Sequence, residues 1–152
     1  DRINLTPVAI REGQAFADSV FGATPTTIAY AQTPSAVFTT PEIGTVGLTE
    51  AEALAQHGAI DIYETQFRPM RATLSGRGER VYMKLIIHGS NGRVLGAHIL
   101  APEAGEMAQL IAGALRMGAT KSDFAATMAV QPTMAEEFVT MRAPSRLLRP
   151  QA

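Results

Sequence analysis

The residues with the clearest chemical potential lie near the end of the chain, in the stretch VQPTMAEEFVTMR at 130–142. Gln131 precedes a proline, and Glu136 and Glu137 follow at the start of a predicted short helix. Negative charge at a helix N-terminus stabilises the helix through its dipole, which is the simplest interpretation of these glutamates. A carboxylate beside a loop can also orient a catalytic imidazole, as the acidic member of a catalytic triad does. Gln131 itself is neutral and can act as neither acid nor base.

A second candidate is the basic stretch RPMRATLSGRGER, which contains Arg68, Arg71, Arg77 and Arg80. An irregular, solvated loop is the simpler interpretation of this stretch. The alternative is an anion-binding rim for a ligand that carries a carboxylate, because guanidinium groups pair with carboxylates through two parallel hydrogen bonds. The sequence leaves both interpretations open.

Several other kinds of site are excluded by residue type. The chain has no cysteine, so it contains no disulfide, thiolate metal site or cysteine nucleophile of its own. Its histidines are widely spaced and match no metal-ligand pattern, so we expect no metal site. They are His57, His88 and His98. Glycine-rich phosphate-binding motifs and a GxSxG nucleophile elbow are also absent from the sequence.

Length, charge and hydropathy narrow the class of protein. The 152 residues suit one compact domain with an appended segment. A composition of 46% hydrophobic and 18% charged residues is typical of a folded globular protein. The formal net charge of −1 gives no broad basic field, so we expect no nucleic-acid partner. No apolar run approaches the roughly 18 residues that span a bilayer, so we expect no membrane partner.

The elements that must position these residues follow from hydrophobic periodicity and from capping and turn residues. Thr6 is the predicted N-cap of the first helix, with Pro7 in its first turn. The predicted helices cover residues 6–22, 49–58, 103–118, 122–128 and 133–140. The predicted strands cover residues 35–40, 43–49, 59–69, 81–88 and 93–100, the last two joined as a hairpin.

This order predicts an α+β fold, an antiparallel sheet with helices on one face. A proline-rich connection makes the first helix, up to Gly22, separable from the rest. Phe124 and Met128 are expected to face the core, and the tail after Arg142 is expected to fray. The helix at 103–118 should bury one stripe, formed by Met107, Leu110, Ile111, Ala114 and Leu115.

Four motifs, in order, carry a family resemblance: VFTTPEIGTVGLTEAEA, FRPM, MGATKSDF and PTMAEEFVTMR. Together they resemble the C-terminal part of the glutathione reductases, flavoproteins of the pyridine nucleotide-disulfide oxidoreductase family. The resemblance extends from Leu5 to about Arg146. It implies that residues 1–22 are the last helix of an FAD-binding domain and that residues 23–152 form the dimerisation (interface) domain.

The resemblance also implies cofactors and partners. FAD and NADPH would serve the full-length protein, with Leu5, Thr6 and Pro7 at the flavin ring. The FAD fingerprint, the redox-active cysteine pair and the NADPH fold would lie upstream of this chain. The chain would form a homodimer in the cytoplasm and act on glutathione disulfide. Alone, it is expected to bind no flavin tightly and to reduce no disulfide.

Substrate contacts are implied for two segments, which would reach the glutathione site of the partner subunit. One holds Met70 and Arg71, and the other holds Glu137 and Thr140. Gln14 stands where some glutathione reductases carry an arginine near the substrate carboxylates. That departure puts the substrate in question, although not the fold.

Gln131 is the main departure from the family pattern, in which its position holds a histidine that carries a proton to the thiolate leaving group. Glu136 is at the position that orients that histidine. General acid–base transfer typically contributes about 10²–10⁴-fold to a rate, and glutamine cannot carry the proton. An introduced change, natural drift and a sequence error all stay open as origins of Gln131.

Two functions follow. The first is the dimerisation and substrate-contact domain of a glutathione-disulfide reductase, favoured by Met70, Glu136, Glu137 and Thr140. The alternative is a non-catalytic dimerisation module that kept the fold and lost the proton-transfer histidine, favoured by Gln131.

Overall fold

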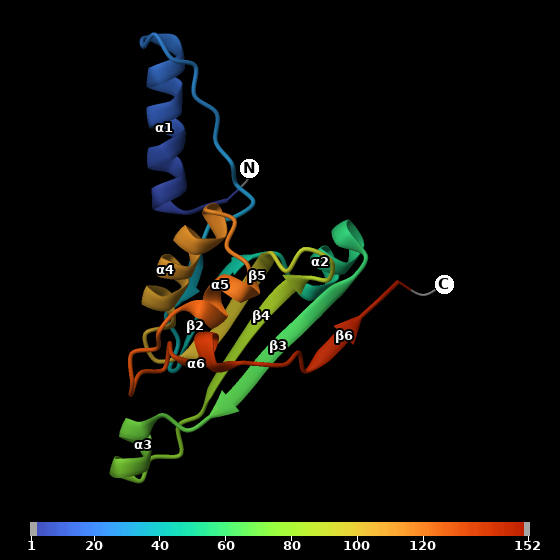
Figure 1. Ribbon diagram of the computed structural model, residues 1–152. Coiled ribbons are helices and arrows are strands. Elements are labelled where there is room, and N and C mark those ends of the chain that lie inside the picture. The colour runs from blue at the N-terminus through green and yellow to red at the C-terminus, as the bar shows by residue number, and fades with distance from the viewer. Residues whose placement is uncertain (1–2, 151–152) are drawn as a thin grey trace. The chain divides into compact units, whose positions relative to one another are not determined.

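The computed structural model describes residues 3–150 and divides into two compact units, one ending at Thr33 and one beginning at Pro34. The first unit consists of α1 (Thr6–Val20) and an extended segment that runs back along the helix (Figure 1). The Tyr30 hydroxyl donates a hydrogen bond of 2.7 Å to the Glu12 carboxylate and so ties the segment to the helix.

The start of α1 differs by one residue from the prediction. Leu5 has the extended backbone of an N-cap, and Thr6 is already helical, so the prediction of Thr6 as N-cap is wrong. Pro7 lies in the first turn as predicted, where its missing N–H leaves no hydrogen bond unmade. No side chain caps this helix N-terminus.

The second unit is built on a six-stranded antiparallel sheet with strand order β1-β2-β5-β4-β3-β6 (Figure 1). In that order the strands are β1 (Ser35–Val37), β2 (Glu42–Gly47), β5 (Val94–Ala101), β4 (Val81–His88), β3 (Ile60–Phe67) and β6 (Arg146–Leu148). The helices are α2 (Glu50–His57), α3 (Met70–Ser75), α4 (Ala104–Arg116), α5 (Lys121–Ala126) and α6 (Glu137–Thr140). The predicted α+β class with an antiparallel sheet is confirmed.

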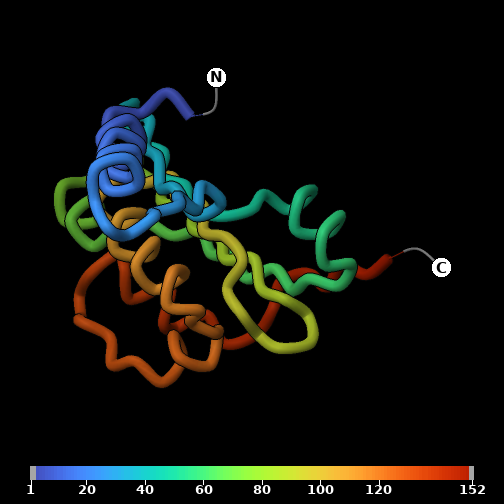
Figure 2. Tube along the Cα trace, turned by 90° about the horizontal axis from the view of Figure 1, so that it is seen from above, coloured from blue at the N-terminus to red at the C-terminus, as the bar shows by residue number. Residues whose placement is uncertain are grey.

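Two apolar cores lie on the two faces of the sheet. The larger core packs α4 and α6 against alternate residues of β4 and β5, such as Met83, Leu85 and Ile99. The smaller core packs Ala53 of α2 against Ile60, Ile62 and Ile86, which point to the opposite face. Figure 2 shows α2 and the later helices on opposite sides of the strands. The prediction of helices on one face therefore holds for α4–α6, and α2 adds a short cover on the other.

The close approach of α4 to the sheet depends on Gly44 in β2. A Cβ at this position would overlap the backbone carbonyl of Ala104, in the first turn of α4. The Glu42 carboxylate, two residues earlier in the same strand, accepts a hydrogen bond of 3.1 Å from the N–H of Gly105. Strand β2 therefore both admits α4 and caps its N-terminus.

Two elements were not predicted from the sequence. Residues 70–75 form α3 rather than an irregular loop, with Pro69 before it and Gly76 in the left-handed conformation after it. The tail does not fray, because β6 pairs with the outer edge of β3, Ile60 with Leu148 and Ile62 with Arg146. Proline before a short helix and glycine after it are the signals that identify α3.

Ion pairs hold β6 against β3 and α2. Arg146 makes two hydrogen bonds of 2.9 Å to the Glu50 carboxylate and a further one of 3.2 Å to Glu64. Lys84 also donates to Glu50, at 2.7 Å. These bonds, with that from Arg146 foremost, lower the pKa of Glu50 from its ordinary value of 4.5 to about 2. Arg146 also lowers the pKa of Glu64.

Substitution of Arg146 should release the tail. We expect Arg146→Met to lower the free energy of unfolding by about 1–2 kcal/mol at neutral pH, because two carboxylates lose a charged partner. The folded pKa of Glu50 is depressed, so the stabilisation is present above pH 4.5 and is lost as the pH falls toward 2. Urea denaturation at neutral pH and through this window should show the difference between the two proteins shrinking.

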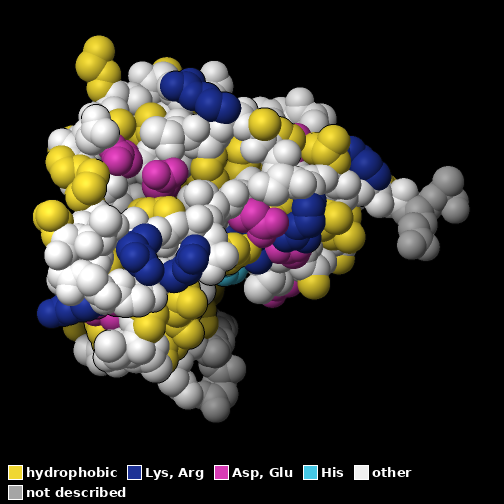
Figure 3. Space-filling view, turned by 90° about the horizontal axis from the view of Figure 1, so that it is seen from below, with side chains coloured by type: hydrophobic (Ala, Val, Ile, Leu, Met, Phe, Trp, Pro, Cys, Tyr) yellow, Lys and Arg dark blue, Asp and Glu magenta, His cyan; other side chains and the backbone are white. Residues whose placement is uncertain are grey.

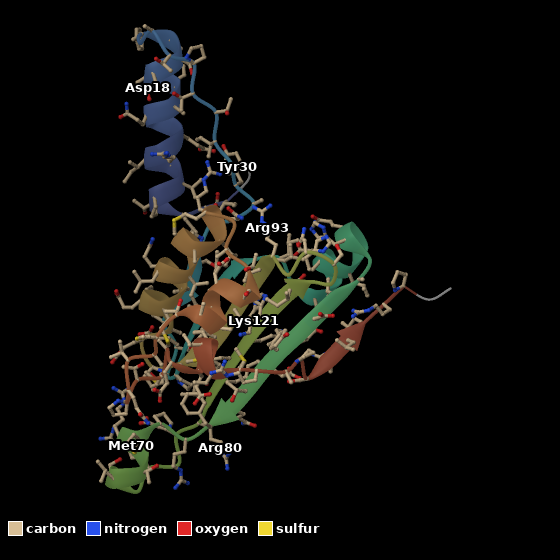
Figure 4. All side chains as sticks on the ribbon, viewed as in Figure 1. Asp18, Tyr30, Met70, Arg80, Arg93 and Lys121 are labelled. Carbon is tan, nitrogen blue, oxygen red and sulfur yellow. The ribbon has the colours of Figure 1, made fainter. Side chains whose placement is uncertain are left out.

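The matched control is Arg80→Met, since Arg80 is exposed and makes no ion pair with residues 3–150 (Figure 4). It should change stability by less than about 0.5 kcal/mol. Equal effects of the two substitutions would contradict a role for the network in holding β6.

Candidate functional site

A cavity of about 490 Å³ lies at the α3 end of the second unit. It is lined by the end of β3 and the start of α3, by Glu103 just before α4, and by the segment 132–137. Three segments that are distant in sequence therefore meet there. Seen from this end, acidic and basic side chains are interspersed with apolar ones and form no single patch of one sign (Figure 3). Of the four arginines in the basic stretch, Arg68 and Arg71 line the cavity and Arg77 and Arg80 do not.

The α3 side of the cavity contributes Met70 and Arg71, two of the predicted site residues. Met70 is the first residue of α3 and is exposed, at the outer end of the unit (Figure 4). The Arg71 guanidinium forms an ion pair with Glu103, with Nη1 and Oε1 3.3 Å apart. Arg68 also lines the cavity, whereas Arg77 pairs with Glu79 outside it. Two arginines of the basic stretch, Arg68 and Arg71, therefore line the cavity.

The opposite side is formed by the segment that leads into α6. Glu136 and Glu137 both line the cavity. The Thr140 hydroxyl donates a hydrogen bond of 3.0 Å to the Glu137 carboxylate, and so joins the predicted group indirectly. The N–H of Glu136 donates to the Thr133 hydroxyl at 3.2 Å, which closes the turn before the helix. The structure therefore brings Met70, Arg71 and the two glutamates together.

Gln131 lies on the same segment but does not line the cavity. It precedes Pro132 through a cis peptide bond, and its side chain is exposed. Within residues 3–150 it makes no hydrogen bond to Glu136. The amide can donate and accept hydrogen bonds, yet it has no proton equilibrium near neutral pH.

The histidines lie away from this cavity. His57 and His88 stack edge to face with ring centroids 5.0 Å apart, at the far end of the sheet. His98 lies in β5, where its Nε2 is 3.1 Å from the carbonyl oxygen of Leu48, and burial lowers its pKa. Within the described part of the chain, no imidazole lines the cavity and no cluster of three or more ligand side chains could hold a metal ion.

The predicted flavin contacts belong to the first unit. Leu5 is the N-cap of α1, Thr6 and Pro7 are its first residues, and no side chain makes a capping hydrogen bond there. Such a helix N-terminus presents N–H donors and the positive end of the helix dipole to an electronegative group. Gln14 donates a hydrogen bond of 2.7 Å to Asp18 on the same helix.

An apolar groove of about 340 Å³ separates α4 from α5 and α6. Among its lining residues are Met107, Leu110, Ile111, Phe124 and Phe138. Leu110 is 78% exposed, so the predicted buried stripe of α4 is wrong at that residue. Met128, which was expected to face the core, is 93% exposed. Both side chains were predicted to be buried because of their helical spacing. Spacing alone does not show whether another element covers an apolar side chain.

Among the charged residues that line the cavity, Glu103 was missed from the sequence. Glu103 has a left-handed backbone, with φ 60° and ψ 27°, and contributes no cap to α4. A glutamate directly before a helix is ordinary in a sequence. Its position opposite Arg71 arises only from the tertiary structure.

Among residues 3–150 no helix has the length and apolar composition that a bilayer span requires.

Comparison with known proteins agrees with the fold. The family model for the pyridine nucleotide-disulphide oxidoreductase dimerisation domain matches residues 33–142. The glutathione reductase of Burkholderia cepacia is 53% identical over 93% of this chain, and the chloroplastic/mitochondrial glutathione reductase of Pisum sativum is 52% identical over 98%. The trypanothione reductase of Leishmania donovani is 40% identical over 95%. The chain spans only 32%, 27% and 30% of the length of these relatives.

The cavity wall formed by α6 depends on Phe138, which is only 3% exposed and packs in the larger core. We expect Phe138→Ala to lower the free energy of unfolding by about 3–5 kcal/mol, because a buried aromatic side chain leaves a cavity. Amide hydrogen exchange at 131–140 should accelerate more than exchange in β4. Leu74→Ala, at an exposed position of α3, is the control. It should change the free energy of unfolding by less than about 0.5 kcal/mol and leave exchange at 131–140 unchanged.

Proposed function

Because this chain belongs to the dimerisation-domain family of the pyridine nucleotide-disulphide oxidoreductases, we propose that it is the C-terminal dimerisation and substrate-contact part of an FAD- and NADPH-dependent glutathione-disulfide reductase. The observation that carries the proposal is the cavity where Met70, Arg71, Glu136 and Glu137 meet. A cytoplasmic location belongs to the same proposal.

The cavity suits part of a peptide disulfide. Its volume of about 490 Å³ lies within the range of small-molecule sites. Arg68 and Arg71 offer donors to a ligand carboxylate, and the Glu136 and Glu137 carboxylates offer acceptors to ammonium and amide N–H groups. Glutathione disulfide carries all of these groups. We propose that the cavity completes the glutathione site of the partner subunit.

The cofactors would act mostly outside this chain. A bound FAD would supply electron transfer from NADPH to a cysteine pair, and this chain contains no cysteine. The uncapped start of α1 fits the proposed flavin contact, since its N–H groups can donate to an electronegative edge of the ring. Leu5, Thr6 and Pro7 are the residues that would hold it. The chain alone is therefore proposed to reduce no disulfide.

Proton transfer is the step in which this chain departs from the family. Reduction of a disulfide releases a thiolate, which must take up a proton. Gln131 can hydrogen-bond to that sulfur or to a water but cannot supply a proton. Glu136 lies five residues on and lines the cavity, where its carboxylate would orient a water or an imidazole. In the full-length protein we propose a slow proton transfer through water.

The groove on α4 is the proposed contact with a second copy of the chain. Leu110 lines the groove and is 78% exposed. Met117, Met128 and Val130, which lie within a few residues of lining residues in the chain, are each more than 70% exposed. Exposed apolar surface of this kind marks interaction sites. A homodimer would cover the groove with its symmetry-related counterpart.

Restoring the imidazole tests the catalytic proposal. In the full-length protein that contains this chain, we expect Gln131→His to raise the rate of NADPH oxidation by glutathione disulfide about 10²–10⁴-fold. The rate should also gain a dependence on pH near 6.5, the ordinary pKa of histidine. Steady-state kinetics across pH measures both changes.

The matched control is Gln109→His, which adds an imidazole on the exposed side of α4 and should leave the rate unchanged. No gain in Gln131→His would contradict the reductase proposal. It would favour the alternative, a dimerisation module without catalysis, to which Gln131 itself points.

The dimer contact is tested by charge. We expect Leu110→Asp to convert the dimer to a monomer at micromolar concentration in sedimentation, because a carboxylate would be buried without a partner in the groove. Leu74→Asp is the control: Leu74 is similarly exposed, at 87%, but lies on α3 outside the groove. If both variants stay dimeric, the interface lies elsewhere.

A further inference from the structure

Glu103 has an unusual backbone for its residue type. Its φ of 60° makes it the one residue other than glycine with a positive φ among residues 3–150. A side chain in the left-handed region clashes with its own backbone, so the conformation persists only where the surroundings impose it. Such residues concentrate at binding sites. The conformation therefore raises the question of what its carboxylate does.

The carboxylate of Glu103 does not serve the helix that it precedes. It makes no capping hydrogen bond to α4, although it occupies the N-cap position. The cap comes instead from Glu42 of β2, whose Oε2 accepts the N–H of Gly105 at 3.1 Å. With that donor satisfied from the sheet, Glu103 can point away from the helix axis.

The carboxylate of Glu103 reaches Arg71 across the cavity wall. Oε1 lies 3.3 Å from Nη1, and this contact joins the start of α4 to α3. The two side chains are 64% and 55% exposed, so a ligand can reach both. Arg71 makes no other ion pair with the described residues.

The contact between Glu103 and Arg71 determines how much positive charge the cavity presents to a ligand. Arg68 and Arg71 face Glu103, Glu136 and Glu137 around one space. With Arg71 bound to Glu103, a ligand carboxylate must compete with Glu103 for the same guanidinium. Glu136 and Glu137 make no ion pair with the described residues, so an ammonium or amide group meets no competing cation there.

We propose that Glu103 is a specificity-determining residue that acts through Arg71, holding its guanidinium over the cavity and weakening its attraction for carboxylate-bearing ligands. The inference rests on the proposed function, because it concerns how the same cavity selects among peptide disulfides. Glutathione disulfide is the probe. The matched probe is its ethyl ester with every carboxylate esterified, which lacks the negative charges.

The test is a set of dissociation constants measured by calorimetry on the full-length protein. The proteins are the unmodified form, Glu103→Gln, Arg71→Met and the double variant. We expect Glu103→Gln to tighten binding of glutathione disulfide about two- to fivefold and to leave the ester unchanged, the range for an exposed ion pair. In the Arg71→Met background the same change should have no effect.

Two results would overturn the proposal: an equal shift for acid and ester, or a shift that persists without Arg71. Glu103→Gly separates the charge from the backbone. It should reproduce the tighter binding without loss of thermal stability, because glycine adopts the left-handed region freely.

A second readout needs no peptide ligand. Phenylglyoxal modifies exposed arginines, and mass spectrometry follows Arg71 alone. We expect faster labelling of Arg71 in Glu103→Gln, with Arg80 labelled equally in both proteins. Equal rates at Arg71 would refute the holding role. If the unmodified protein binds neither disulfide, the proposed function fails, and the labelling rates still decide whether Glu103 holds Arg71.

Discussion

The packing of α4 on β2 is the constraint on which the rest of the second unit depends. Gly44 lets the first turn of the helix approach the strand closely, and Glu42 satisfies its N-terminus. One face of α4 then closes the larger core, through Ala108 and Leu115. The outer side of α4, with Leu110, is left for a groove, while its start, with Glu103, is directed to the cavity. A single close contact therefore sets the positions of both proposed surfaces.

The cavity also requires that the segment 127–142 be held, although it contains only one turn of helix. It is fixed on both sides in sequence. Before it, the Thr120–Asp123 capping box begins α5, and after it Arg146 is paired with Glu50 and Glu64. Between these anchors Phe138 and Met141 are buried. An irregular segment is positioned well when its ends and its apolar side chains are fixed, and its polar side chains can then face a ligand.

Much of this architecture could be predicted from the sequence, because its signals are local. Thr49 with Glu52 and Thr120 with Asp123 form the capping boxes that their spacing indicates. Asn91-Gly92 lies in the turn between β4 and β5, where Gly92 has the positive φ that such a turn requires. The family model then agrees with the resemblance drawn from four motifs. Capping and turn hydrogen bonds, and the alternation of apolar and polar residues in strands, depend on residues that are close in sequence. They can therefore be predicted without knowledge of the fold.

The features that could not be predicted depend on partners far away in sequence. β6 exists because Arg146 meets Glu50 and Glu64, which lie 96 and 82 residues away in the chain. Met128 has the spacing of a core residue but no element covers it within the described chain. Glu103 is available for its proposed role only because Glu42 caps α4 in its place.

Gln131 shows the opposite relation. Its inability to carry a proton is plain from residue type alone. The structure adds only that it precedes a cis proline, on the segment from which Glu136 and Glu137 line the cavity. A site can thus keep its backbone and its neighbouring side chains while the identity of one side chain decides whether a proton is transferred. The fold of this loop and the proposed proton transfer are therefore separable, because the residues that anchor the loop lie in the core and at β3, not at residue 131 itself.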